Sequence, residues 1–211
     1  LAERMRGIPA YIVMPRTDPE IKKKAVAGYG GIITFCEPTL QARESTLEEV
    51  VRETGATVVH PYDNFFVIAG QGTAAKELIE DAGAFDIIMA PVGGGGLLSG
   101  SSISTKNLLP HCQVIAAEPA GADDAFRSFR DGVIYPSVNP KTIADGLLTS
   151  LSERTFTIIK KNVDDILTVS EEKIVEAMRL IWERMKIVVA EKQQHRGRPG
   201  TAHRGQGIGQ R

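Results

Sequence analysis

The sequence is poor in cysteine and has no long hydrophobic run. Two cysteines, Cys36 and Cys112, stand among 211 residues, which is too few for a disulfide framework and fits a reducing compartment. No hydrophobic run approaches the roughly 20 residues that a membrane-spanning helix needs, and no secretory leader pattern is recognisable. These absences predict a cytoplasmic protein without a membrane partner.

The sequence also lacks an excess of charge of one sign. Its 25 basic and 26 acidic residues give a net charge of −1, whereas nucleic-acid and membrane surfaces usually show a basic excess. No nucleic-acid partner is therefore expected. Hydrophobic residues make up 42% and charged residues 24% of the chain, which is typical of a globular protein with a core.

Strand-like hydrophobic runs alternate with longer, charged, helix-compatible stretches. The expected strands are 10–14, 31–35, 57–60, 87–91 and 114–117. The expected helices are 19–29, 47–54, 65–82, 97–109, 122–129 and a capped amphipathic helix from Ser170 to about residue 189. Such alternation predicts β-α-β units and an α/β fold with open, mostly parallel sheets.

The last segment, 190–211, differs in composition from the rest. It has five glycines and four arginines and no hydrophobic periodicity. A segment of this kind buries too little hydrophobic surface to offset its loss of conformational entropy. We therefore predict that residues 190–211 are disordered.

The four consecutive glycines Gly93–Gly96 follow the expected strand 87–91 and open the next helix. Without Cβ atoms, several backbone N–H groups can converge there, and the helix N-terminus adds its positive dipole end. This combination suits a dianionic phosphate. The alternative is a tight strand-to-helix turn that binds no ligand.

Two better-known phosphate-binding motifs do not fit this loop. A dinucleotide G-x-G-x-x-G would need glycine at position 98 or 99, where Leu98 and Ser99 stand. A P-loop starting at Gly95 would need lysine at position 101, which is Ser101.

Several motifs resemble those of the fold-type II pyridoxal-phosphate enzymes of the threonine/serine dehydratase and serine racemase family, and they follow one another in the order and at the spacing of that family. The resemblance extends from residue 1 to about residue 189. It rests on GIPAYIVMP at 7–15, IAGQGT at 68–73, VGGGGLLSG at 92–100, AEP at 117–119, ADD at 122–124, IADG at 143–146, VDDI at 163–166 and WERMK at 182–186.

The resemblance implies a two-lobed, tryptophan-synthase-β-like fold. Residues 1–61 would form part of a small mobile lobe, residues 62–189 part of a large cofactor-binding lobe, and 190–211 a tail foreign to the family. The implied cofactor, pyridoxal 5'-phosphate, would contact Tyr62, Gly93, Gly94, Gly95, Gly96, Leu97 and Gly146.

The activity implied by the resemblance is β-elimination of a small hydroxy amino acid to a 2-oxo acid and ammonia, or racemisation of serine. Serine, threonine and 3-hydroxyaspartate are the candidate substrates, and a homodimer is expected if the protein is complete. Tyr62 stands where animal racemases tend to have asparagine, which favours elimination.

The resemblance places no catalytic residue within this sequence. The Schiff-base lysine is expected before residue 1, and the hydroxyl partner of the cofactor ring nitrogen after the last helix. The sequence that follows Val189 does not resemble that segment. We therefore interpret the chain as a truncated, frame-shifted and inactive product, with a genuine alternative terminus as the other interpretation.

A second set of candidate residues follows the expected strand 114–117. Glu118, Asp124 and the carbonyl of Ala122 are hard oxygen ligands of the kind that Mg²⁺ or Ca²⁺ prefers. The spacing alone favours an alternative, in which Asp123 and Asp124 cap a helix and Glu118 is solvated. The pattern is similar to the metal site of eukaryotic-type serine racemases, and this resemblance favours a structural or regulatory cation.

Two alternative functions remain open. The first is a β-replacing synthase of the same fold. The second is a non-catalytic protein that holds phosphate ligands or contacts RNA through the Gly/Arg tail, although arginines without interleaved aromatic residues are a weak RNA signal.

Overall fold

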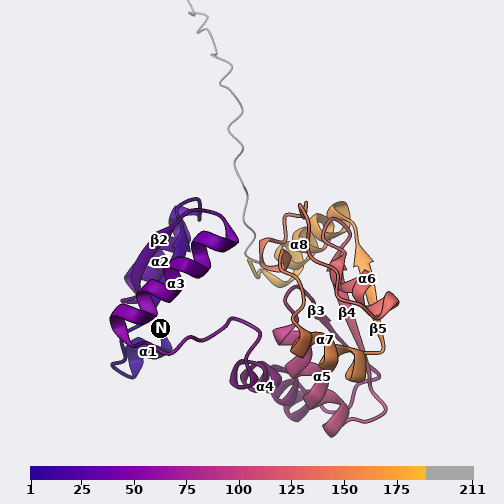
Figure 1. The fold of residues 1–211 in the computed structure, drawn as a ribbon. Helices are drawn as coiled ribbons and strands as arrows, with labels where there is room; N and C mark the ends of the chain where they lie inside the picture. The colour runs from indigo at the N-terminus through magenta and orange to yellow at the C-terminus, as the bar shows by residue number, and fades with distance from the viewer. Residues whose placement is uncertain (189–211) are drawn as a thin grey trace, which may run out of the picture. The chain divides into compact units, whose positions relative to one another are not determined.

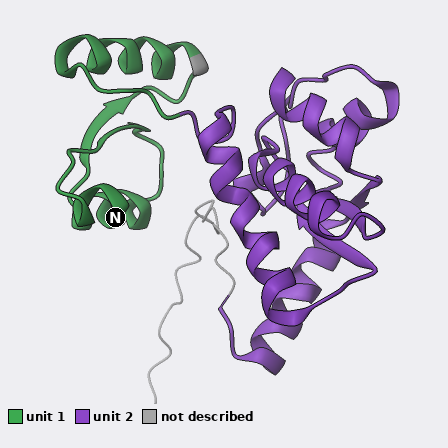
Figure 2. Ribbon diagram, turned by 90° about the horizontal axis from the view of Figure 1, so that it is seen from below, with its two compact units in different colours: residues 1–59 green, residues 60–211 purple. Residues whose placement is uncertain are grey.

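The computed structural model describes residues 1–188, of which Leu40 is described by its backbone alone. The chain forms two compact units that divide between Val59 and His60 (Figure 2). The predicted tail, 190–211, lies outside the described residues.

Unit 1 is a small α/β unit. Its strands β1 (Tyr11–Pro15) and β2 (Ile32–Cys36) pair in parallel, and α2 (Glu20–Gly28) connects them. The other helices are α1 (Ala2–Met5) and α3 (Leu40–Thr54). Met14, Cys36 and Val50 are its buried hydrophobic residues.

Unit 2 contains a three-stranded parallel sheet in the order β3-β4-β5 (Figure 1). The strands are β3 (Ile87–Pro91), β4 (Gln113–Pro119) and β5 (Asp165–Val169). The helices are α4 (Phe65–Ala82), α5 (Gly96–Leu108), α6 (Asp124–Asp131), the 3-10 helix η1 (Asp145–Leu147), α7 (Glu153–Asn162) and α8 (Glu171–Met185). The predicted α/β class with open parallel sheets is confirmed.

One face of this sheet carries the main core. Val114, Ala116 and Ile166 point from the strands to that face, and Leu98 of α5, Ala125 of α6 and Ile159 of α7 pack on them. On β3, residues alternate as the pleat requires, with Ile88 and Ala90 buried but Ile87 and Met89 exposed. The contact between helices and sheet thus fixes the position of the β3–α5 junction.

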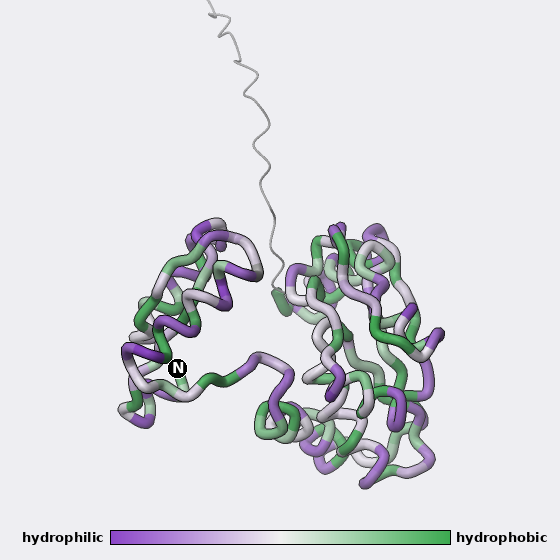
Figure 3. The backbone as a smooth tube through the Cα atoms, viewed as in Figure 1, coloured by the Kyte–Doolittle hydropathy of each residue, from purple (hydrophilic) through white to green (hydrophobic). Residues whose placement is uncertain are grey.

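Hydrophobic and hydrophilic residues form short stretches along the chain. Hydrophobic and hydrophilic stretches alternate along both units in Figure 3. Among the residues that the structure describes, no helix is both long and hydrophobic enough to cross a membrane.

The expected strand at 57–60 is wrong, because these residues are irregular and end in a turn. The Asp63 N–H donates to His60 Nδ1 at 2.9 Å, so the chain turns immediately after the hydrophobic run. Helix α7 and strand β5 were not predicted, and α3 begins seven residues earlier than expected, where the Thr39 hydroxyl caps it.

Helices α4 and α5 lie side by side and cross where two glycines meet (Figure 1). A Cβ on Gly100 would collide with the Ile68 carbonyl and lie 2.5 Å from the Gly72 nitrogen. The Ser104 hydroxyl donates to the Gly72 carbonyl at 2.8 Å across the same crossing. The absence of side chains therefore sets the distance between the two helices.

We predict that Gly100→Ala lowers the free energy of unfolding by about 1–3 kcal/mol, because the helices must separate to admit one methyl group. The matched control is Gly70→Ala in α4, where a Cβ meets nothing within 4 Å. It should stabilise the helix by about 0.5–1 kcal/mol. Urea unfolding followed by circular dichroism measures both, and equal effects would contradict the close crossing.

Candidate functional site

The glycine loop lies at the carboxyl end of β3, where open α/β sheets usually bind their ligands. Gly95 is the N-cap of α5 and has φ 85°, a left-handed conformation that favours glycine. The first helical hydrogen bond runs from the Ser99 N–H to the Gly95 carbonyl at 2.9 Å. The amides before Ser99 therefore have no acceptor within the helix, and they suit a phosphate.

The neighbours of the loop leave no room for side chains on it. A Cβ on Gly94 would collide with the Tyr62 ring, and one on Gly96 would lie 2.9 Å from the Tyr62 Cβ. A Cβ on Gly93 would lie 2.9 Å from the Leu147 Cα, and one on Gly95 2.8 Å from Leu151. Close packing is thus sufficient to explain why glycine stands at these four positions. The evidence for a phosphate site is instead the set of backbone amides before Ser99 that have no acceptor within the helix.

A tight turn before α4 places Tyr62 on the loop. His60 Nδ1 accepts the Asp63 N–H, and the His60 and Tyr62 rings meet edge to face at 4.6 Å. The Asn64 side chain caps α4 by accepting the N–H groups of Phe66 and Val67 at 2.8 and 3.2 Å. His60 is therefore a structural residue of this turn.

Arg154 of α7 stabilises the same turn by contacts with Asp63 and Phe65. Its guanidinium donates to the Asp63 carbonyl at 2.9 Å and lies 4.2 Å from the centre of the Phe65 ring. Sequence analysis missed Arg154, because nothing in the local pattern links it to a turn 91 residues earlier.

Gly146 approaches the loop from η1, and its carbonyl would lie 3.2 Å from a Cβ on Gly93. A Cβ on Gly146 itself would meet nothing within 4 Å, in contrast to the four loop glycines. The structure thus brings Tyr62, Gly93–Gly96 and Gly146 together, and Leu97 follows in the first turn of α5. Protein packing therefore does not require glycine at 146, since a side chain there would enter open space.

The second candidate set lies at the end of β4. Glu118, Ala122 and Asp124 are 2%, 5% and 2% exposed. The two Glu118 carboxylate oxygens accept the N–H groups of Ala125 and Phe126 at 2.9 and 2.7 Å. Glu118 therefore caps α6 from the neighbouring strand, and the alternative with a solvated Glu118 is wrong.

The acids beside Glu118 differ in their pairing. Asp123 is the N-cap residue of α6 but makes no capping bond with its side chain, which pairs with Arg127 at 2.9 Å. The buried Asp124 Oδ2 has no hydrogen-bond partner within 3.5 Å, although the Ser137 hydroxyl, which also lacks a partner at that distance, lies near enough to lower the pKa of Asp124. A buried carboxylate oxygen without a partner is costly, and a cation would compensate for this cost.

Electrostatics at this set favour protonation when no cation is bound. Burial raises the pKa of Glu118 to about 7, assisted by Asp124 and Asp123 and opposed by the two amide donors. Burial likewise raises the pKa of Asp124, which the Ser137 hydroxyl and Arg127 oppose. Within residues 1–188, no group of three or more His, Cys, Asp or Glu side chains could hold a metal ion. The candidate set would therefore need the Ala122 carbonyl or water as further ligands.

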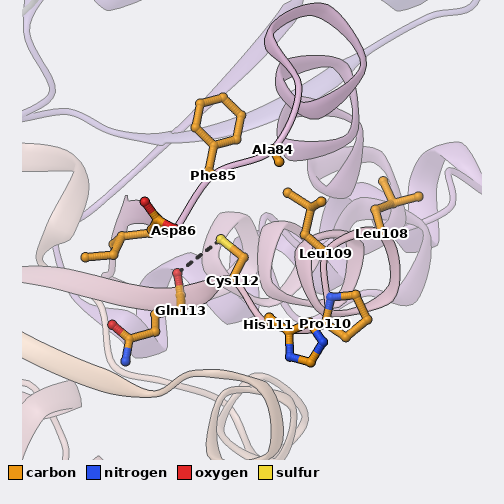
Figure 4. A pocket seen from close by; sticks show the side chains of 10 residues that line it. Ala84, Phe85, Asp86, Leu108, Leu109, Pro110, His111, Cys112 and Gln113 are labelled. Atoms are coloured by element: carbon orange, nitrogen blue, oxygen red, sulfur yellow. Dashed lines mark hydrogen bonds between the residues drawn. The ribbon is translucent and has the colours of Figure 1, made fainter.

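A hollow of about 530 Å³ lies at the opposite end of the sheet, where β3 and β4 begin (Figure 4). Asp86, His111, Cys112 and Gln113 are among its lining residues. The Cys112 thiol donates a hydrogen bond to the Gln113 carbonyl at 3.5 Å, and burial raises the pKa of the thiol. A thiol with a raised pKa is a poor nucleophile, so this hollow is not the candidate site.

Known proteins resemble the whole described chain. A β-hydroxyaspartate dehydratase of Paracoccus denitrificans (strain Pd 1222) is 50% identical over 188 residues, which are 89% of this chain and 60% of that protein. The crystal structure of serine racemase from Dictyostelium discoideum superposes with a TM-score of 0.85 at 48% identity, covering 89% of this chain and 60% of that one. The crystal structure of a T.th. threonine deaminase gives a TM-score of 0.83 at 45% identity, with 89% and 62% covered.

The chain thus spans about 60% of the length of such relatives. Residues 1–192 match the sequence profile of the family described as "Pyridoxal-phosphate dependent enzyme". The structural relatives have the fold-type II architecture that the sequence motifs indicated. The chain therefore belongs to the pyridoxal-phosphate dependent enzyme family.

Proposed function

We propose that the protein holding this chain is a pyridoxal-phosphate dependent ammonia-lyase or racemase of small hydroxy amino acids. One observation carries the proposal: Tyr62, Gly146 and the free amides of the glycine loop converge at the carboxyl end of β3. The relatives named as β-hydroxyaspartate dehydratase, serine racemase and L-threo-3-hydroxyaspartate ammonia-lyase support serine and 3-hydroxyaspartate as substrates, and the threonine deaminase structure supports threonine.

The role of this chain in the reaction is to hold the cofactor. The amides from Gly93 to Leu97 would bind the phosphate, helped by the N-terminal dipole of α5. The Tyr62 ring would border the cofactor, and Gly146 would let the backbone of η1 approach it. When bound, pyridoxal phosphate supplies the electron sink for a substrate that has lost its α-proton.

Elimination is the favoured reaction, since Tyr62 replaces the asparagine expected in animal racemases. The names of relatives at 43–50% identity support elimination and racemisation, and they do not favour the β-replacing synthase. By the same resemblance we infer a homodimer, in which residues 1–61 belong to a small mobile lobe and 62–189 to the cofactor lobe. The two cysteines, too few for a disulfide framework, support a cytoplasmic location.

The direct test uses the protein expressed from the complete reading frame that holds this sequence. With pyridoxal phosphate it should release a 2-oxo acid and ammonia from serine, threonine or 3-hydroxyaspartate. Chiral chromatography of the remaining serine measures racemisation in the same reaction. Formation of a thioether from an activated serine and sulfide, without release of a 2-oxo acid, would favour the synthase instead.

Gly146→Ala separates binding from folding in that protein. Its methyl group enters open space, so the free energy of unfolding without cofactor should change by less than about 0.5 kcal/mol. Affinity for cofactor or substrate should fall at least about tenfold, since a ligand fills that space. Unchanged affinities would remove Gly146 from the site.

We also propose that Glu118, the Ala122 carbonyl and Asp124 bind Mg²⁺ or Ca²⁺ as a structural or regulatory ion. The support is the unpartnered, buried Asp124 Oδ2 beside a second buried carboxylate. Each Glu118 oxygen accepts one N–H and retains a second lone pair for a cation.

The cation proposal predicts different behaviour for two adjacent acids. After dialysis against EDTA, added Mg²⁺ or Ca²⁺ should raise the melting temperature of the wild-type protein and of Asp123→Asn. The rise should vanish in Asp124→Asn, because Asp124, unlike Asp123, is a proposed ligand. Equal responses of the two variants, or no response of the wild type, would contradict the site.

The raised pKa of Glu118 predicts a pH dependence in EDTA. The folded chain keeps a proton on Glu118 up to about pH 7, whereas the ordinary pKa is 4.5. The stability that this proton contributes is fully present below pH 4.5 and is lost as the pH rises through about 7. Chemical unfolding between pH 5 and 8 should show this loss in the wild type and a smaller one in Glu118→Gln. Equal slopes for both proteins would be the contrary result.

A further inference from the structure

The connecting loop 137–147 carries Gly146 and ends in η1. At its far end, Leu147 and the Gly146 carbonyl pack directly on Gly93 of the glycine loop. Near its start, the Ser137 N–H donates to the Ser150 hydroxyl and the Lys141 N–H to the Gly121 carbonyl, each at 2.8 Å. These contacts fix the first part of the connecting loop.

The second part is fixed by a distant acid. Two amides donate hydrogen bonds within the connecting loop: that of Ala144 to the Thr142 hydroxyl, and that of Leu147 to the Ala144 carbonyl. The Ile143 N–H instead reaches Glu171 Oε2 at 2.8 Å, across 28 positions of sequence. Ile143 stands three residues before Gly146, so this bond holds the chain two residues before η1 begins.

Glu171 is the first residue of α8, but the helix does not need it as a cap. The Ser170 hydroxyl caps α8 by accepting the Lys173 N–H at 3.4 Å. The other Glu171 oxygen, Oε1, is buried and has no hydrogen-bond partner. A carboxylate in this position costs free energy, and the described contacts offer one use for it, the bond to Ile143.

We propose that Glu171 is a positioning residue for the cofactor site. It holds Ile143, and thereby the turn of η1, so that the Gly146 carbonyl and Leu147 stay packed on Gly93. The hydrogen bond that the described structure gives Glu171 is to Ile143, so it would act through residues 143–147. The inference rests on the proposed function, in which the glycine loop binds pyridoxal phosphate.

Four variants of the complete protein test the proposal. Glu171→Ala removes the acceptor, and Glu171→Asp keeps the charge but shortens its reach by one methylene. Glu171→Gln keeps an acceptor at full length and should rescue the contact. Glu172→Ala is the matched control, because Glu172 is also acidic and in the first turn of α8 but is exposed.

The first measurement is amide hydrogen exchange without added cofactor. Exchange of a peptide covering 142–148 should quicken about tenfold in Glu171→Ala and Glu171→Asp, as expected for losing a bond to a charged acceptor. It should stay within about threefold of wild type in Glu171→Gln and Glu172→Ala. Glu171→Asp retains the negative charge at the start of α8. Faster exchange in this variant therefore cannot be attributed to the loss of that charge, which could unfold Glu171→Ala more generally.

The second measurement is the dissociation constant of pyridoxal phosphate, followed by its fluorescence. It should rise about tenfold in Glu171→Ala and Glu171→Asp but less than about threefold in the other two variants. Equal exchange in all variants, or faster exchange with unchanged cofactor affinity, would overturn the positioning role.

Failure of the proposed function has a different signature. If wild-type protein binds no pyridoxal phosphate, the cofactor site itself is refuted, and with it a role for Glu171 toward the cofactor. Exchange that quickens only in Glu171→Ala and Glu171→Asp would then show that Glu171 orders the connecting loop for another purpose.

Discussion

The close approach of Tyr62, Leu147 and Leu151 to the glycine loop is the contact on which the site depends. These residues occupy the volume where Cβ atoms of Gly93–Gly95 would stand. They come from the turn before α4, from η1 and from the segment before α7, so one short loop fixes three distant segments. The loop leads directly from β3 into α5, whose first amides, like those of any helix, have no acceptor within the helix.

Two acidic residues hold other parts of the same unit. Glu118 of β4 caps α6 by accepting two N–H groups, and Glu171 of α8 accepts the N–H of Ile143. Each carboxylate accepts backbone amides of another segment: Glu118 those of the helix that follows its strand, and Glu171 that of a residue 28 positions earlier. Burial makes such acids costly, and this cost is the physical reason to expect a cation at Glu118 and a positioning role at Glu171.

Local patterns in the sequence predicted what local interactions determine. Helix α4 begins and ends where its pattern predicted, since Asn64 caps it and Gly83 follows it. The convergence of Tyr62 and Gly146 on Gly93–Gly96 was predicted from the family resemblance, and spacing alone could not have given it. The error at 57–60 has a physical cause, because a hydrophobic run becomes a strand only when another strand pairs with it.

Other features depend on tertiary contacts, and the sequence around the residues involved does not predict them. The burial of Glu118 follows from the packing of α6 on β5 and α7, and spacing alone suggested a solvated side chain. The contact of Arg154 with the Asp63 carbonyl joins residues 91 positions apart. The run of glycines was also less informative about a ligand than its sequence suggested, because packing accounts for every glycine of the loop.

A crystal structure of the complete protein with pyridoxal phosphate would test the central claim most directly. We predict that the phosphate oxygens lie within hydrogen-bonding distance of backbone amides between Gly93 and Leu97, with Tyr62 and Gly146 bordering the cofactor. A phosphate bound elsewhere, such as in the hollow beside Cys112, with the loop amides in contact only with water, would contradict it.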